Sequence, residues 1–416
     1  MISVGAPVRL DIRARFSTSD LPAQPVQSPP VAALTDYIGN AEQFPVLRHW
    51  DFFNHAGVAP VCRAAGDAMR AYADQAESQA YLAHNWYADL EKLRVSAAAM
   101  IGAHRDEIAF LKNTSEGISA VAFGLDWQWG DVIVTTDVEY PANVYPWMEV
   151  ARAHGAKLVL VPEESDARGR RAVPLERILE AASDPRCRLV ALSHVEFASG
   201  QRHDIARVGQ LCRDQGKLFC VDAIQTMGII PIDVRAMKID YLAADGHKWL
   251  LGPEGAGIFY CRRELLERTR PLMVGWMNVI DAQDFGNYNY ILKSDAGRFE
   301  CGTYNIAGLL GLKASLELLA SIGVEAVGLR IKALTDRLID GILARGYDLV
   351  SPRESDQWSG GVCFTSPKHP HDAIVRELRK QRKIEIAQRE GRLRASPHFY
   401  NTDEQIDRLI SALPEH

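Results

Sequence analysis

The chain has 416 residues, of which 47% are hydrophobic, and a formal net charge of −6. This length exceeds what one hydrophobic core usually fills, so two packed domains are expected, and an acidic balance without a basic stripe argues against nucleic acid or an anionic membrane as a partner. No apolar run approaches the roughly 20 residues that span a bilayer, and seven scattered cysteines without Cys-x-x-Cys spacing predict reduced thiols, no metal site and a cytoplasmic location.

The predicted elements begin after an N-terminal arm. Residues 1–45 combine proline, serine, alanine and arginine without a clear period, so this segment is expected to be extended. Between residues 46 and 303, helical patterns alternate with short apolar runs, which predicts βαβ units and a mostly parallel sheet. The predicted strands are 132–135, 158–161, 189–193, 218–221, 241–244 and 257–260, and predicted helices at 143–154, 174–182 and 205–215 separate the first four.

The pattern changes after residue 303. Long helices are predicted at 306–322 and 324–345, followed by short strands at 361–365 and 384–388 and by helices at 371–381 and 403–413. We therefore expect an α/β protein with an arm (1–45), a large domain (46–303) and a smaller α+β C-terminal domain (304–416).

Lys248 is the first candidate for chemistry. It follows the apolar run 241–244 and precedes the turn-forming segment Gly252-Pro253-Glu254-Gly255. A lysine at such a strand end has a rigid base and can be partly desolvated, which a Schiff-base lysine requires near neutral pH. Since lysines are mostly exposed, a surface lysine in a loop is the default interpretation for this residue taken alone.

Asp222 changes that interpretation. It ends the apolar run 217–221, and a carboxylate at the C-terminal end of a buried strand faces the crevice where open α/β sheets bind ligands. Pyridoxal phosphate needs such an anion, because the carboxylate keeps the pyridine nitrogen protonated. A helix N-cap is the alternative for Asp222 alone. Together with Lys248, about one strand, turn and strand away, it favours a pyridoxal-phosphate site.

With these two residues in place, residues 221–257 resemble the class V aminotransferase family of fold-type I pyridoxal-phosphate enzymes. This family includes cysteine desulfurases, isopenicillin N epimerase-like enzymes and kynureninase. The similarity runs from about residue 52 to the C-terminus. It implies a large domain with a mostly parallel seven-stranded sheet flanked by helices, a bound pyridoxal 5'-phosphate, a small amino acid as substrate, and a homodimer whose active site is shared across the interface.

The resemblance also assigns cofactor contacts. Lys248 matches the Schiff-base lysine, Asp222 the partner of the pyridine nitrogen, and Gln225 the hydrogen-bond partner of the phenolic oxygen. The segment 113–117 has the composition of a helix start, whose free N–H groups bind phosphate. In this segment Thr114 and Ser115 are expected to contact the phosphate, and His247 is expected as a second phosphate ligand. Tyr140 is expected to stack on the cofactor ring. Gly302 and Thr303 are expected to reach the phosphate of the partner subunit.

Substrate contacts are expected from two further segments. Arg394 matches the family's arginine for the substrate carboxylate, a role that suits a planar guanidinium. Asn54 and His55 belong to a turn-rich loop that borders the substrate pocket in the family, and His55 could contact a carboxylate or relay a proton.

Two departures from the desulfurase pattern stand out. Phe197 occupies the place of an asparagine near the ring oxygen. Between residues 384 and 394 the connection is short and lacks the mobile cysteine that takes sulfur from the substrate, and the last cysteine, Cys363, lies in a predicted strand.

These observations predict a pyridoxal-phosphate enzyme that acts on a small amino acid through Lys248. Transamination is the first expectation because no nucleophile for β-substituent chemistry is evident. A C–S lyase or cysteine desulfurase-like activity and amino-acid epimerisation are the alternatives. A catalytically idle homologue that only binds is the non-enzyme alternative, and a nucleotide-binding enzyme is disfavoured because no G-x-G-x-x-G motif follows a strand.

Overall fold

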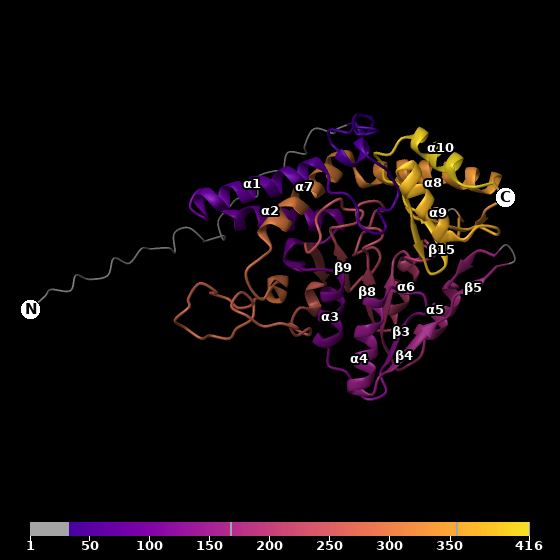
Figure 1. The fold of residues 1–416 in the computed structure, drawn as a ribbon. Helices are drawn as coiled ribbons and strands as arrows, with labels where there is room; N and C mark the ends of the chain where they lie inside the picture. Colours follow the sequence, from indigo (N-terminus) through magenta and orange to yellow (C-terminus); the bar gives the residue numbers. More distant parts are fainter. Residues whose placement is uncertain (1–32, 167–168, 355–356, 416) are drawn as a thin grey trace, which may run out of the picture.

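The computed structural model describes residues 33–166, 169–354 and 357–415. Most of the predicted N-terminal arm, residues 1–32, lies outside the described residues. The remainder of that segment forms two short 3-10 turns, Leu34–Asp36 and Pro45–Arg48, with the side chain of Phe44 buried between them and the rest of the protein. Figure 1 shows one large unit built around a sheet and a second, C-terminal unit beside it.

A seven-stranded sheet forms the centre of the large unit. Its order is β2-β10-β9-β8-β7-β3-β4. Every neighbouring pair is parallel except the two that involve β10, so six strands share one direction and the predicted mostly parallel sheet is confirmed. The strands are β2 (Ile108–Leu111), β3 (Val132–Thr136), β4 (Lys157–Val161), β7 (Cys187–Ser193), β8 (Leu218–Asp222), β9 (Tyr241–Asp245) and β10 (Gly257–Cys261).

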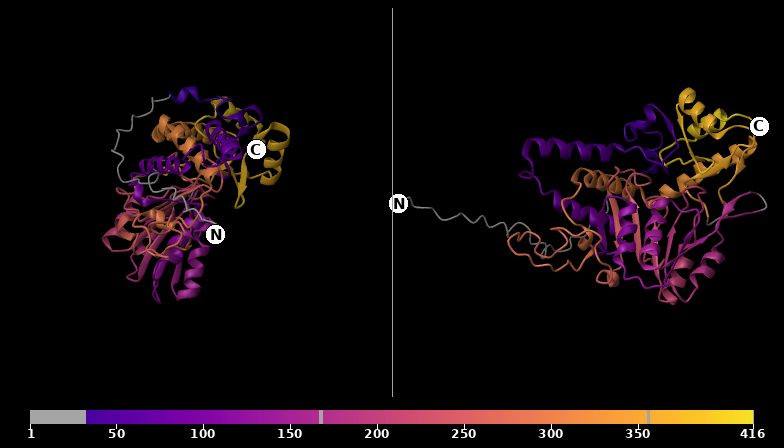
Figure 2. Two further views of the ribbon diagram at one scale, coloured as in Figure 1. Left: turned by 90° about the vertical axis from the view of Figure 1, so that its left-hand side faces the viewer. Right: turned by 60° about the horizontal axis from the view of Figure 1, so that its bottom comes forward.

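Both faces of this sheet are covered, because neighbouring residues of a strand point to opposite sides. In β8, Phe219 and Val221 contribute to one hydrophobic core, whereas Leu218 and Cys220 contribute to the other. The first core joins the sheet to α1 (Arg63–Gln79), α2 (Trp86–Met100), α5 (Leu175–Ala182), α6 (Ile205–Asp214) and α7 (Ile306–Ile322); the second joins it to α3 (Thr114–Gly124) and α4 (Tyr145–His154). Figure 1 and Figure 2 show α1, α2 and α7 lying side by side.

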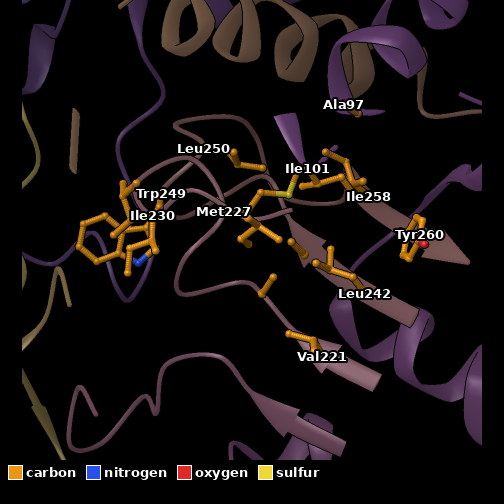
Figure 3. Close-up of a cluster of buried hydrophobic side chains, with 14 of the residues drawn as sticks. Ala97, Ile101, Val221, Met227, Ile230, Leu242, Trp249, Leu250, Ile258 and Tyr260 are labelled. Carbon is orange, nitrogen blue, oxygen red and sulfur yellow. The ribbon is translucent and has the colours of Figure 1, made fainter. Parts of the chain in front are cut away.

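The first core also supports the ends of the central strands. Met227, Trp249 and Leu250 belong to the same cluster as Val221 of β8 and Leu242 of β9, and Figure 3 shows Met227 and Leu250 between Trp249 and these strands. Trp249 is almost completely buried, and its indole N–H donates to Gln225 Oε1 at 2.9 Å. This indole anchors the turn that carries Lys248, so the site rests on a rigid support.

The C-terminal unit has its own core. A four-stranded antiparallel sheet has the order β11-β12-β15-β14 and packs against three helices. Its elements are α8 (Val324–Ala344), β11 (Asp348–Leu349), β12 (Val362–Thr365), α9 (His371–Glu377), a π-helical turn (Leu378–Arg382), β13 (Ile384–Glu385), β14 (Ala387–Arg389), β15 (Arg392–Ala395) and α10 (Asp403–Ala412).

One segment crosses from the N-terminal part to this unit. Strand β1 (Asp51–Phe52) pairs in parallel with β13, and the side chain of Phe53 lies in the C-terminal core. Packing therefore crosses the predicted division at residues 303 and 304 in both directions: residues 51–53 pack with the C-terminal unit, and α7, which the prediction assigns to the C-terminal domain, packs in the first core with α1 and α2.

Within the described residues, no single helix is both long and apolar enough to cross a membrane; only α7 and α8 taken together reach that composition, and they are bent by 81°. Among the residues that the structure describes, no three His, Cys, Asp or Glu side chains lie close enough together to hold a metal ion.

Candidate active site

A cavity of about 660 Å³ lies where the parallel strands end. Open α/β sheets bind their ligands at this edge, because the loops after successive strands meet there. The cavity brings together residues from the large sheet, the N-terminal loop and the hairpin of β14 and β15. Those used below are Phe52, Asn54, Thr114, Ser115, Tyr140, Phe197, Asp222, Gln225, Asp245, His247, Lys248, Glu254, Arg389 and Arg394.

Lys248 reaches this cavity three residues after β9. Its side chain is about nine-tenths buried, and Nζ lies 5.6 Å from the centre of the Tyr140 ring. Burial lowers the pKa of Lys248 to about 8, with Arg394 and Arg389 acting in the same direction and Asp222 and Asp245 opposing it. A sizeable fraction of the amine is therefore neutral near pH 8, as imine formation requires.

Asp222 is the last residue of β8 and lines the same cavity. It is almost fully buried, and Oδ1 accepts a hydrogen bond from the backbone N–H of Ile224 at 2.9 Å. Burial raises the pKa of Asp222 to about 6, and both this hydrogen bond and Lys248 limit the increase. The carboxylate is thus charged at neutral pH and suited to a cationic partner.

Two further buried acids near Asp222, Glu139 and Glu196, have raised pKa values. Burial raises the pKa of Glu139 well above its ordinary value and that of Glu196 to about 8. Glu139 accepts hydrogen bonds from the N–H and hydroxyl of Ser193, and Glu196 lies 2.9 Å from His203. Sequence reasoning missed both, because neither lies at a helical or strand spacing that would show its burial.

The expected phosphate site lies at the start of α3. Thr114 and Ser115 are its first residues, and both line the cavity. The Thr114 hydroxyl is buried and has no hydrogen-bond partner among the described residues. A Cβ at Gly117 would lie 2.7 Å from the Cβ of Ala243, so this glycine lets the helix approach β9. The helix therefore offers an unpartnered hydroxyl and the N-terminal N–H groups that favour phosphate.

His247 lies on the same side of the cavity. Its Nδ1 is 2.9 Å from Oδ2 of Asp245, and Asp245 also accepts the backbone N–H of Gly246. The carboxylate lies beside Nδ1, which leaves Nε2 for another partner.

Tyr140 and Phe197 form an aromatic wall. Their ring centres are 5.2 Å apart and the planes meet at 83°. The Tyr140 ring is half exposed, which leaves a face available for an offset stack.

The amide of Gln225 is fixed by two protein contacts, since Oε1 accepts from Trp249 and Nε2 donates to the carbonyl of Ala56 at 3.1 Å. One hydrogen of Gln225 Nε2 therefore remains free to donate to a ligand oxygen. The neighbouring Phe197 side chain has no donor for that oxygen.

Arg394 projects from β15 into the cavity and is 2% exposed. Its Nη1 donates to the carbonyl of Phe197 at 2.8 Å, and its Nε has no partner among the described residues. Burial lowers the pKa of Arg394 to about 10, and its only hydrogen bond among the described residues is to a backbone carbonyl, not to a carboxylate. A buried guanidinium with unused donors is a strong site for a ligand carboxylate.

The two residues of the N-terminal loop that are predicted to contact substrate, Asn54 and His55, lie in different places. Asn54 lines the cavity, and its bridge to Ser396 places it beside the strand of Arg394. His55 does not reach the cavity: its ring is fully buried, with Nδ1 2.8 Å from the carbonyl of Ser396 and Nε2 2.6 Å from the Tyr400 hydroxyl. Burial lowers the pKa of His55 to about 4, so it is neutral. In this structure the ring ties the N-terminal loop to the C-terminal unit, and its predicted substrate contact stays a prediction.

Gly302 and Thr303 also lie apart from Lys248. They line a separate cavity of about 260 Å³, together with Phe110, Gly255 and Cys301. Glu300, two residues before Gly302, is held by Arg94, whose Nη1 donates to Glu300 Oε1 at 2.8 Å. Within one chain these two residues therefore do not meet the other expected cofactor contacts.

The connection between residues 384 and 394, where desulfurases carry the mobile cysteine, is a tight hairpin in this protein. β14 and β15 pair with Arg389 opposite Arg392, so that only Glu390 and Gly391 connect them. Both have positive φ, 45° and 72°, which is the two-residue turn that matches the twist of a hairpin. Cys363 is fully buried in β12, and no described residue that lines the Lys248 cavity is a cysteine.

The sequence matches the aminotransferase class-V family over residues 52–409. A probable cysteine desulfurase of Methanothermobacter thermautotrophicus is 33% identical over 397 residues, which cover 89% of this chain and 96% of the relative. The chain belongs to the aminotransferase class-V family.

Solved structures of this family agree with the fold. The apo structure of a cysteine desulfurase from Thermococcus onnurineus NA1 is 28% identical, covers 91% of this chain and 97% of its own, and superposes with a TM-score of 0.80. The cystine C–S lyase C-DES, solved with its reaction product cysteine persulfide, is 26% identical, covers 89% and 98%, and has a TM-score of 0.78.

This class V enzyme uses pyridoxal phosphate. The residues present fit the cofactor: a partly desolvated amine on Lys248, a buried carboxylate on Asp222 and an unpartnered hydroxyl on Thr114 all face one cavity. These are the groups that an aldehyde, a pyridine nitrogen and a phosphate require.

The titration of the buried groups of Asp222 and Lys248 predicts that the rate of Schiff-base formation depends on pH. When cofactor is added to apoprotein, we expect the rate at which the yellow Schiff-base absorption develops to increase with pH. Raising the pH through about 6 charges Asp222, and raising it through about 8 neutralises the amine of Lys248. Stopped-flow absorbance from pH 5.5 to 9 measures this rate. A rate that declines over this range would contradict the assignment.

Proposed function

We propose that this enzyme cleaves the Cβ–S bond of a small cysteine-derived amino acid by β-elimination. The observation that carries the proposal is the cavity itself, which combines Lys248, Asp222 and Arg394 and has a two-residue turn where a mobile cysteine would be needed. An elimination requires a base and an electron sink but no enzyme thiol. The names of the relatives, which include desulfurases and a C–S lyase, support chemistry at sulfur.

Each residue has a defined task. Arg394 binds the α-carboxylate, and this contact orients the Cα–H bond toward the amine of Lys248, which accepts the proton. Pyridoxal phosphate, when bound, supplies the electron sink that acidifies this bond. The C–H electron pair forms the Cα=Cβ bond, and the Cβ–S bond breaks with its pair on sulfur. The released aminoacrylate hydrolyses to pyruvate and ammonia.

Transamination is the second candidate, because the same residues also support it and the decision depends on where the proton returns. Epimerisation is the third outcome, with the proton returned to the opposite face of Cα.

One experiment separates these reactions. Holoenzyme is incubated with L-cysteine, L-cystine and L-alanine, each with and without 2-oxoglutarate, and sulfide or persulfide, pyruvate and the D-enantiomer are measured. The proposal predicts equal amounts of reduced sulfur and pyruvate without 2-oxoglutarate. If keto product forms only when 2-oxoglutarate is present, transamination is correct and C–S cleavage is not.

We also propose that the enzyme is a cytoplasmic homodimer in which Gly302 and Thr303 contact the partner's cofactor phosphate. Their position supports this, because within one chain they line the neighbouring cavity and not the cavity of Lys248.

A further inference from the structure

The hairpin of β14 and β15 presents three arginines on one face. Residues opposite each other in an antiparallel pair share a face, and so do residues two apart on a strand. Arg389 is opposite Arg392, and Arg394 is opposite Ala387, so all three side chains project to the same side. Arg389 and Arg394 are diagonal neighbours, a spacing of about 7 Å that long side chains can close.

Only one of these arginines has its charge compensated. Arg392 forms an ion pair with Glu163 at 2.9 Å and donates to the carbonyl of Ala198. Arg389 donates only to the carbonyl of Gln388, and neither it nor Arg394 has a carboxylate partner in the part of the chain that the structure describes. Two guanidinium groups with unused donors therefore remain on this face.

Both of these arginines line the cavity of Lys248, and both contribute to the low pKa of its amine. The acidic groups of the cavity have other positions: Asp222 and Asp245 end strands of the large sheet, and Asp245 is occupied by His247. Glu254 precedes β10 in the same sheet. The hairpin wall is thus cationic, and one α-carboxylate can neutralise only one of its two free charges.

We propose that Arg389 determines specificity by binding a second acidic group on the substrate side chain. The inference rests on the proposed function for the identity of Arg394 as the α-carboxylate site. It assigns the substrate class as cysteine-derived amino acids whose sulfur carries a second anion, such as a sulfinate or an S-linked carboxylate. The tight turn at Glu390 and Gly391 fixes the backbone of Arg389 relative to that of Arg394, which limits the range of distances between the two anions that the pair can bind.

The test measures binding rather than turnover. Isothermal titration calorimetry of holoenzyme with succinate and with butyrate compares a four-carbon diacid with a four-carbon monoacid. We expect succinate to bind about tenfold more tightly than butyrate, the effect of one additional charge-assisted hydrogen bond. Arg389→Gln should remove this difference by weakening succinate alone, and Arg389→Lys should restore part of it.

A matched control is Arg382→Gln, which makes the same charge change at an exposed position of the same unit outside the cavity. It should bind both ligands as the wild type does. Equal affinities for succinate and butyrate in the wild type, or equal losses for both in Arg389→Gln, would overturn the role of Arg389. If succinate preference is intact but no C–S cleavage occurs, the proposed reaction fails and this inference stands.

Discussion

Lys248→Ala is expected to abolish turnover, with a loss on the order of 10⁴-fold or more. The substitution removes both the anchor of the cofactor and the base at Cα, and general-base catalysis alone contributes about 10² to 10⁴-fold. Borohydride reduction of wild-type holoenzyme should fix the cofactor on the peptide that contains Lys248. The variant should show no such peptide by mass spectrometry.

Lys157→Ala is the matched control, because Lys157 is exposed on β4, at the far edge of the same sheet. It should retain wild-type turnover and the labelled peptide. Measurable turnover in Lys248→Ala above the rate of free cofactor would remove Lys248 from its assigned role.

Asp222→Asn is expected to have the second largest effect, a decrease in kcat on the order of 10³-fold. The change preserves volume but removes a buried charge that faces the cavity. An ion pair at about 4 Å with an effective dielectric constant near 20 contributes about 4 kcal/mol, which corresponds to this factor. The amide leaves the pyridine nitrogen less protonated, so the electron sink is weaker while binding of substrate through Arg394 is retained.

Steady-state kinetics distinguish this effect from a structural defect, since kcat should decrease with KM nearly unchanged. Asp214→Asn, at the exposed C-terminal end of α6, removes a charge without approaching the cavity and should be neutral. A variant in which KM rises and kcat is preserved would show that Asp222 acts in binding only.

The sequence allowed much of the fold to be predicted, because its elements have simple local signals. The helix at 306–322 is confirmed with the same ends, and all six predicted strands of the large sheet occur within two residues of the expected ends. The seventh strand, β2, is not among the predicted strands. It has four apolar residues, two residues before α3, and so short a run cannot be assigned by periodicity alone.

The site was partly predictable for a related reason. Asp222 and Lys248 follow successive strands, and strand ends converge by topology, so their common cavity follows from the order of the chain. The position of His55 did not follow, because it depends on contacts with Ser396 and Tyr400 that are more than 300 residues away. Arg389 was also missed, since only the pairing register of β14 and β15 places it on the face of Arg394.

The turn of Glu390 and Gly391 has a consequence for the fate of the product. A longer connection could swing a side chain outward and pass a bound atom to another macromolecule. Two residues are too few for such a movement. If the proposed C–S cleavage is correct, we therefore expect the sulfur product to leave as a small dissolved compound that a recipient protein would have to capture from solution.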